Sequence, residues 1–224
     1  MQSDFIHYML DLLSSGQQLN ELKYQLHTKI DEIGVVSFIR DIATPLGILV
    51  GEKWQTNQLP VFVEHLYAAQ MNEVLNTIIV HNDAIYHAGT PKVLLCTVTG
   101  ERHTLGNMMV QALLCSEKAF CLNLGELSVT EIIHAASYYE INVVGISFSV
   151  MFNKRMMHAM VTQLRKNLSH KTELWIGGGG IRHHHLLNPI NNIKVLDKVD
   201  DILSAYALTQ HTLANHDTAP NNTI

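Results

Sequence analysis

Five short apolar runs, each separated from the next by a helix-like stretch, occupy the second half of this 224-residue chain. The runs are rich in Val, Ile and Leu and cover residues 92–100, 119–126, 141–149, 172–180 and 192–197. Such alternation is typical of a parallel sheet with helices on both faces. The order of elements predicts a five-stranded, doubly wound sheet of the flavodoxin type. In such sheets, ligands bind beyond the carboxyl ends of the strands.

The first half of the chain has helical periodicity. Apolar residues recur at Leu19, Leu22, Leu26 and Ile30, and Gly34 is expected to end that helix. Further helices are expected over residues 5–13, 35–54 and 61–83. These helices predict a bundle.

Three regions are therefore expected along the chain. A bundle of four or five helices covers residues 1–87, and a Rossmann-like α/β domain covers residues 91–214. The polar residues 215–224 are expected to form a flexible tail.

Composition excludes several classes of function. The net charge of −5 and the scattered basic residues argue against a nucleic-acid surface, which needs clustered Lys and Arg. The three cysteines lack CxxC spacing and are expected to be reduced core residues. No run is expected to span a membrane, and no signal peptide is evident, so a cytoplasmic protein is predicted.

One histidine, His103, follows the first predicted strand in the sequence TGERHTLG. Taken alone, it would be a surface-loop residue. However, Glu101 lies two residues before it, a serine ends the third predicted strand, and glycines end the fourth. A carboxylate often holds the second nitrogen of a metal-bound imidazole. A single histidine is a poor zinc site, so a metal would have to arrive with most of its ligands, as cobalt does in a corrin ring.

Other ligands are less well supported at this edge of the sheet. The phosphate loop GxxxxGK[ST] is absent, and no GxGxxG turn follows the first strand. A nucleotide or dinucleotide site is therefore not expected.

The second half resembles the cobalamin-binding domain, whose signature is DxHxxG, then SxL, then GG. The matching residues are Glu101-Arg102-His103-Thr104-Leu105-Gly106, Ser147-Phe148-Ser149 and Gly177-Gly178. The resemblance implies cobalamin bound with its own base displaced and His103 as the lower cobalt ligand. It implies that the displaced nucleotide tail runs beside Ser147 and the glycines, with Gly106 leaving room. Glu stands where the signature has Asp, and Ser149 stands where it has Leu.

The helical half carries a second motif, Trp54 followed after nine residues by Glu64-His65. Taken alone, these would be a core aromatic and a solvated helix face. Placed before a cobalamin domain, they resemble the CarH/LitR family of cobalamin-dependent photoreceptors and transcription regulators. The resemblance implies that Trp54 caps an adenosyl group above the corrin and that Glu64 and His65 line the same pocket. It also implies that light breaks the cobalt–carbon bond and moves the bundle.

The chain departs from that family in two ways. The bundle begins almost at Met1, which leaves no room for a DNA-binding helix-turn-helix. A protein partner, such as a transcription regulator, is therefore expected in place of DNA. Gln55 stands where some relatives have a histidine that ligates cobalt after photolysis, so that step is expected either to be absent or to use another residue.

The sequence thus predicts a sensory or regulatory cobalamin-binding protein that is not an enzyme. Adenosylcobalamin is the expected cofactor, with methyl- or hydroxocobalamin as alternatives, and a homo-oligomer is possible. Two other functions stay open: a corrinoid methyl-carrier subunit of a methyltransferase, and a cobalamin storage or escort module.

Overall fold

The computed structural model describes residues 2–82, 90–184 and 193–217. The chain divides into two compact units, Met1–Asn82 and Asp83–Ile224. The predicted end of the bundle at residue 87 lies outside the described residues. The final helix continues to Asp217, and residues 218–224 of the predicted tail lie outside the described residues.

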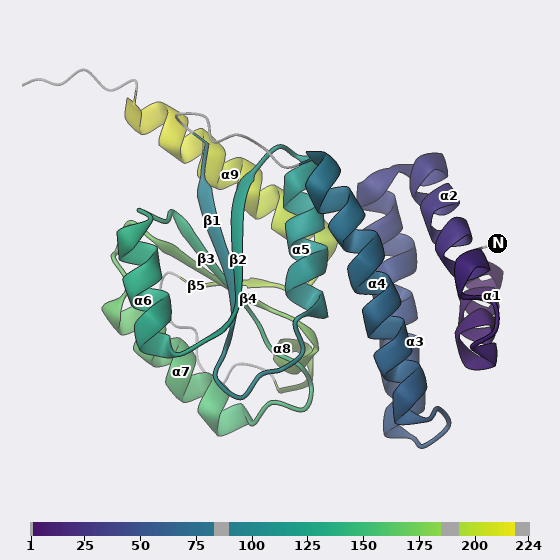
Figure 1. Cartoon of the computed structure of the whole chain (residues 1–224). Coiled ribbons are helices and arrows are strands. Elements are labelled where there is room, and N and C mark those ends of the chain that lie inside the picture. Colours follow the sequence, from purple (N-terminus) through teal and green to yellow (C-terminus); the bar gives the residue numbers. More distant parts are fainter. Residues whose placement is uncertain (1, 83–89, 185–192, 218–224) are drawn as a thin grey trace, which may run out of the picture. The chain divides into compact units, whose positions relative to one another are not determined.

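The first unit is a bundle of helices, as predicted (Figure 1). Its elements are α1 (Gln2–Ser15), α2 (Leu19–Phe38), the π-helical turn η1 (Ile39–Ala43), α3 (Thr44–Gln55) and α4 (Val61–Asn82). The predicted periodic positions Leu22 and Leu26 of α2 are buried in its core, whereas Leu19 and Ile30 are half-buried.

The prediction that Gly34 ends a helix is only partly right. Gly34 has φ 78° and ψ 162°, which is not helical, and it kinks α2. The chain resumes the helix and continues to Phe38, so the break is local. The expected single helix over residues 35–54 is divided by η1, just before Pro45. A proline has no N–H for the carbonyl four residues earlier, which interrupts the regular ladder at this point.

The stretch Leu19–Gln55 differs from the expectation that no run could span a membrane. By length and composition it is long and apolar enough, with a mean hydropathy of 1.7 in its most apolar window. Ile42, Leu46 and Val50 are buried within the bundle, and 33% of that apolar window is buried. A core helix of a bundle passes the same test, so this stretch is weak evidence for a membrane.

The second unit contains the predicted five-stranded sheet. Its strands are β1 (Lys92–Val98), β2 (Phe120–Leu127), β3 (Val143–Ser147), β4 (Glu173–Gly177) and β5 (Ile193–Leu196). All are parallel in the order β2-β1-β3-β4-β5. This is the flavodoxin order, and the predicted fold class is confirmed.

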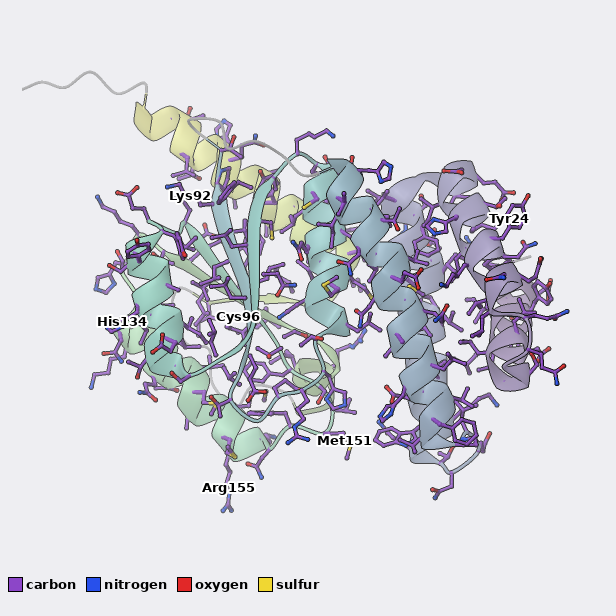
Figure 2. The ribbon with its side chains drawn as sticks, viewed as in Figure 1. Tyr24, Lys92, Cys96, His134, Met151 and Arg155 are labelled. Carbon is purple, nitrogen blue, oxygen red and sulfur yellow. The ribbon has the colours of Figure 1, made fainter. Side chains whose placement is uncertain are left out.

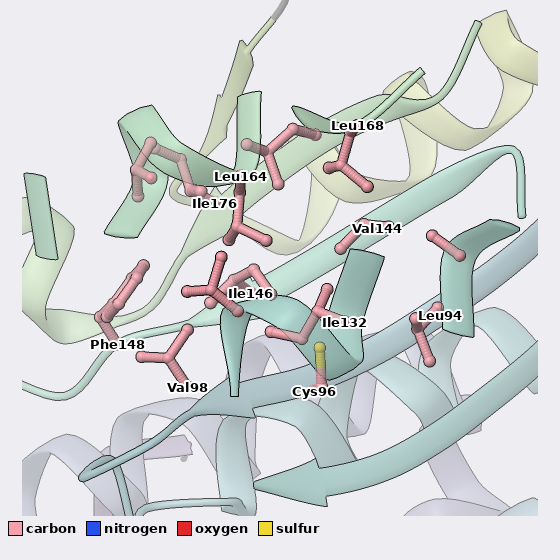
Figure 3. Close-up of a cluster of buried hydrophobic side chains, with 14 of the residues drawn as sticks. Leu94, Cys96, Val98, Ile132, Val144, Ile146, Phe148, Leu164, Leu168 and Ile176 are labelled. Atoms are coloured by element: carbon pink, nitrogen blue, oxygen red, sulfur yellow. The ribbon is translucent and has the colours of Figure 1, made fainter. Parts of the chain in front are cut away.

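Helices cover both faces of the sheet (Figure 1). They are α5 (Leu105–Ser116), α6 (Val129–Tyr138), α7 (Lys154–Asn167), the short α8 (Gly179–His184) and α9 (Val199–Asp217). Figure 3 shows the core on the α6–α7 side, where Leu94, Cys96 and Val98 of β1 belong to one buried cluster with Ile132 of α6. The alternate residues Val93 and Leu95 pack on the α5–α9 side. This separation follows from the two-residue period of a strand.

Side chains of the sheet interior are enclosed by the domain, whereas side chains on the outer faces of the helices extend away from it. Figure 2 shows Cys96 within the sheet domain, whereas His134 and Arg155 extend outward from α6 and α7. Cys96, Cys115 and Cys121 do not form disulfides among the described residues, which agrees with the prediction of reduced cysteines. Burial raises the pKa of the Cys96 thiol to about 12.

Candidate functional site

The loop between β1 and α5 is built around one buried carboxylate. Glu101 is 1% exposed although it lies in a loop at the carboxyl end of the sheet. Its Oε1 accepts a hydrogen bond from the backbone N–H of His103 at 2.9 Å. Its Oε2 accepts one from the backbone N–H of Ser149, after β3, at 2.7 Å. Glu101 therefore ties together two loops that are 48 residues apart in sequence.

The imidazole of His103 lies against the same carboxylate. Its Nδ1 is 2.7 Å from Glu101 Oε1, and its side chain is 50% exposed. An ionised carboxylate only accepts hydrogen bonds, so this contact places the ring hydrogen on Nδ1. The opposite nitrogen, Nε2, is then the one whose lone pair suits a metal ion.

The hydrogen bonds of Glu101 also decide its ionisation. Burial alone would raise the pKa of this carboxyl group. The side-chain contact with His103 and the N–H groups of Ser149 and His103 outweigh burial, and the pKa lies below its usual range. Glu101 is therefore an anion at neutral pH and accepts hydrogen bonds with both carboxylate oxygens.

Two of the predicted site residues, Gly106 and Gly178, lie against the hydroxyl of Ser147, at the end of β3. A Cβ placed on Gly106 of α5 would lie 2.8 Å from Ser147 Oγ, and one on Gly178 would lie 2.9 Å from it. Ser147 is paired with Gly177 in the sheet. The small residues of the motif thus form a cradle of bare backbone around one hydroxyl.

Gly178 has the tightest surroundings of these glycines. Its φ is +92°, and a Cβ there would lie 2.4 Å from the carbonyl oxygen of Phe148. The neighbouring Gly177 carbonyl accepts a hydrogen bond from the Phe148 N–H at 3.0 Å. The strand ends of β3 and β4 approach so closely that no side chain fits between them.

Ser149 contributes through its backbone. Its N–H binds Glu101, so any residue at this position can make that contact. The hydroxyl is buried and lies close enough to Glu101 to help lower the pKa of that carboxyl group. The replacement of the usual leucine therefore leaves the clamp on Glu101 intact and adds a polar atom.

The three predicted residues of the helical unit lie at one end of the α3–α4 pair. Trp54, near the end of α3, is half-buried, and Glu64 and His65 lie in the first turns of α4. Glu64 Oε2 is 3.5 Å from His65 Nε2, and the histidine is the more exposed of the two. The connection is tight, because the N–H groups of Gln58 and Leu59 both bond to the carbonyl of Lys53.

Sequence reasoning missed three polar residues near the β1–α5 loop. Glu126 Oε1, in β2, accepts a hydrogen bond from the N–H of Gly100 at 2.9 Å. Thr97 of β1 and Asn107 of α5 are buried. Asn107 directly follows the histidine motif, but nothing in the sequence distinguishes it from a surface residue of a helix start.

Two hollows in the surface of the described residues lie away from this loop. One, of about 550 Å³, lies beside Leu124, Tyr138 and Tyr139. The other, of about 590 Å³, lies beside Asn142 and Asn167 near the amino ends of the strands. The His103 site is instead a half-exposed imidazole next to close-packed backbone, so a large ligand would have to cover the outside of the site or separate its elements.

Comparison with known proteins gives a likeness of fold. No protein-family model matches the chain, and no curated protein sequence matches it. The monomethylamine corrinoid protein of Methanosarcina barkeri matches with a TM-score of 0.67 and 12% identity, over 93% of this chain and 100% of that one. At this identity the likeness shows the fold alone.

Two further solved structures match less closely. A cobalamin-binding protein from Desulfitobacterium hafniense has a TM-score of 0.41 and 15% identity, over 92% of this chain and 97% of that one. The methanol:cobalamin methyltransferase complex of Methanosarcina barkeri has a TM-score of 0.43 and 15% identity, over 97% of this chain and 86% of that one.

Proposed function

We propose that this chain binds cobalamin with the cofactor's own base displaced and with His103 as the lower axial ligand of cobalt. The observation that carries the proposal is the buried Glu101, which holds His103 Nδ1 at 2.7 Å beside the cradle of Gly106, Ser147 and Gly178. The fold shared with a corrinoid protein supports it.

The residues of the site fit this group. Groups of three or more His, Cys, Asp or Glu side chains that could hold a bare metal ion are absent from the part of the chain that the structure describes. The donor set suits a metal that brings its equatorial ligands and needs one imidazole. The bare backbone at Gly106 and Gly178 suits the close approach of a flat or extended ligand.

Glu101 would act through His103. Its two oxygens are held by backbone N–H groups, so the carboxylate cannot rotate away and the imidazole stays in one tautomer. When bound, cobalamin supplies a cobalt–carbon bond that can be made and broken. The protein's part is to fix the lower ligand and to shield the upper one.

The test of the ligand is the absorption spectrum of bound cobalamin. His103→Ala is expected to remove the histidine-ligated spectrum and to weaken binding, because the imidazole is lost. His134→Ala, an exposed histidine on α6, is the matched control and is expected to leave spectrum and affinity unchanged. Identical spectra for the wild type and His103→Ala would refute the ligand assignment.

For the biological role, we infer that the chain is a corrinoid subunit that carries a methyl group in a methyltransferase system. The full-length likeness to a monomethylamine corrinoid protein supports this role. Such a subunit would act with a methyltransferase as its protein partner and would work in the cytoplasm. Its upper face must accept small alkyl groups, so it is expected to bind methylcobalamin as tightly as adenosylcobalamin.

The motif of the helical unit favours a second candidate, a light-responsive regulator that binds adenosylcobalamin. Trp54, Glu64 and His65 lie at the same end of the α3–α4 pair, and a half-buried tryptophan there suits an aromatic cap for an adenine. This protein would act through a partner such as a transcription regulator, and its oligomeric state could respond to light.

One comparison separates the two roles. The regulator is expected to bind adenosylcobalamin more tightly than methylcobalamin, and Trp54→Ala should abolish that preference. The wild-type regulator should also change its oligomeric state or the hydrogen exchange of α3 and α4 under green light. Equal affinities for adenosylcobalamin and methylcobalamin, together with no response to illumination, would decide for the methyl carrier. A preference that Trp54→Ala removes, together with a light response, would decide for the regulator.

A further inference from the structure

One segment of the sheet unit is basic although the chain as a whole is acidic. Residues 141–172 contain no Asp or Glu but five of the 15 Lys and Arg residues, in a chain of net charge −5. Four of the five lie on α7 and the last follows it: Lys154, Arg155, Arg165, Lys166 and Lys171. Positive charge is therefore concentrated on α7 and on the turn after it.

The outer side of α7 presents a basic residue at each end. Four exposed residues recur there at steps of three or four, which places them on one stripe of the helix: Arg155, Ala159, Thr162 and Lys166. Arg155 and Lys166 are about 16 Å apart along the axis. Figure 2 shows Arg155 extending outward from α7. The small side chains of Ala159 and Thr162 let a partner approach the helix closely between the two charges.

The exposed bases of this segment have no acidic partner of their own. The side chains of Lys154, Arg155, Lys166 and Lys171 form no ion pair within the described residues. Bases elsewhere in the chain do pair with carboxylates: Lys23, Lys29, Arg40, Lys92, Arg182 and Lys194. Lys154 and Arg155 also lie in the first turn of α7, where the helix dipole disfavours positive charge. Helix stability therefore does not account for them, whereas an anionic partner would.

A hollow of about 590 Å³ lies at the C-terminal end of α7. Its volume falls in the range of ligand clefts, roughly 300–1,000 Å³. Apolar side chains of α6 and Leu168 line it, together with the polar Asn167 and Lys171. Glu140 lines it as well, and its carboxylate is paired with Lys92 at 3.4 Å. The hollow thus offers apolar surface to a side chain and a lysine to a neighbouring carboxylate.

The turn that forms one side of the hollow is fixed by the buried guanidinium of Arg165. Its Nη1 donates to the Thr172 carbonyl at 2.8 Å, and its Nη2 donates to the carbonyls of Leu168 and Ser169 at 3.1 and 2.6 Å. These three residues all line the hollow. A surface that is ordered before a partner arrives loses less conformational entropy on binding.

We propose that the outer stripe of α7 and the hollow at its end form a docking surface for an acidic segment of a partner protein. The segment pairs its carboxylates with Arg155, Lys166 and Lys171 and inserts one aromatic or aliphatic side chain into the hollow. Charge complementarity selects an acidic partner, because the bases are unmatched within the described residues. The apolar hollow selects a protein over a phosphate polymer, because side chains that fill pockets dominate protein interfaces.

The surface is independent of the proposed cobalamin site. The hollow lies near the amino ends of the strands, whereas the His103 loop follows the carboxyl end of β1. A partner held on this surface would therefore leave the His103 loop uncovered. Substitutions in the docking surface are expected to leave cobalamin affinity and spectrum unchanged.

The experiment uses two fluorescently labelled probes and measures their affinity by anisotropy. A copolymer of glutamate and tyrosine supplies carboxylates and aromatic anchors, and polyglutamate of equal length supplies carboxylates alone. The wild type should bind the copolymer roughly 10-fold more tightly than polyglutamate, because one aromatic side chain is buried in the hollow. Both affinities should fall as salt is raised.

Two kinds of variant separate the charges from the hollow. Lys166→Glu and Lys171→Glu should each weaken both probes roughly 3–10-fold, because an attraction becomes a repulsion. Lys198→Glu, an exposed base on the chain before α9, is the matched control for charge and should change neither affinity. Asn167→Trp fills the hollow at unchanged charge and should lower the affinity for the copolymer to that for polyglutamate. The two exposed lysine variants decide the question if Asn167→Trp does not fold.

Several results would overturn the docking surface. These are no binding of the copolymer by the wild type, equal affinities for the copolymer and polyglutamate, or equal effects of Lys171→Glu and Lys198→Glu. Tighter binding of duplex DNA or of vesicles of anionic phospholipid than of the copolymer would overturn the choice of a protein partner. A wild type that binds the copolymer but not cobalamin would overturn the proposed function and leave this inference standing.

Discussion

The substitution Gly178→Ala tests the packing that shapes the site. The new Cβ would lie 2.4 Å from the backbone oxygen of Phe148 and 2.9 Å from Ser147 Oγ, at a φ of +92°. Gly125→Ala is a matched control. Gly125 in β2 also has a positive φ, +69°, but nothing lies within 4 Å of its Cβ position. The two variants share the backbone strain and differ in the steric clash.

The expected loss of stability is the sum of two costs, the backbone strain at positive φ and the steric clash. A positive φ costs an alanine about 1–2 kcal/mol, which applies to both variants. The clash at Gly178 must move backbone, because Phe148 contributes a carbonyl oxygen, and such overpacking costs about 1–3 kcal/mol more. The free energy of unfolding should therefore fall by about 2–5 kcal/mol for Gly178→Ala, against 1–2 for Gly125→Ala.

The assay is urea unfolding followed by tryptophan fluorescence. The chain has two tryptophans, Trp54 in the bundle and the buried Trp175 in β4. In a Trp54→Phe background, the remaining signal reports the sheet unit alone. The urea midpoint of Gly178→Ala should lie below that of Gly125→Ala by an amount on the order of 1 M. Equal midpoints would show that β4 does not approach the loop after β3 as closely as described.

Three further predictions concern other parts of the fold. Ser128 caps α6 by accepting from the Glu131 N–H, so Ser128→Ala should cost about 1 kcal/mol in urea unfolding; no loss would contradict the cap. The buried Tyr67 hydroxyl donates to the Ala43 carbonyl in η1, so Tyr67→Phe should destabilise the bundle by about 1 kcal/mol in thermal unfolding, and an unchanged midpoint would argue against this bond. Burial raises the pKa of Cys96 to about 12, so iodoacetamide at pH 8.5 should modify this thiol only in urea, as mass spectrometry can show. For the same reason its contribution to stability should fall as pH rises above about 9, where the thiol ionises in the unfolded chain first.

The sheet could be predicted from the sequence because its central strands, β1, β3 and β4, are buried on both faces. Runs such as Lys92–Val98 are almost continuously apolar, and the helix-like stretches between them leave a parallel sheet as the natural arrangement. The bundle was predicted less accurately. The kink at Gly34 and the π-turn η1 depend on how the helices pack, and a helical period continues through both.

The site was predictable only where a side chain has one evident role. Glu101 and His103 lie two residues apart after a strand, and their contact follows from that local geometry. The bond from the Ser149 N–H to Glu101 could not be predicted, because a backbone group carries no sequence signal. Thr97 was missed for a different reason: its unpartnered hydroxyl becomes apparent only when the surrounding side chains are in place.

The most direct test of the account is the electron paramagnetic resonance spectrum of the cobalt(II) form of bound cobalamin. A nitrogen ligand on the axial position splits the cobalt lines, and the cofactor's own base would do so as well as a histidine. Protein labelled with nitrogen-15 histidine distinguishes the two. The account predicts that labelling changes each superhyperfine triplet to a doublet, and that His103→Ala removes the labelled splitting. A triplet that persists with labelled histidine would mean that the cofactor's base stays on cobalt, and it would contradict the assignment of His103.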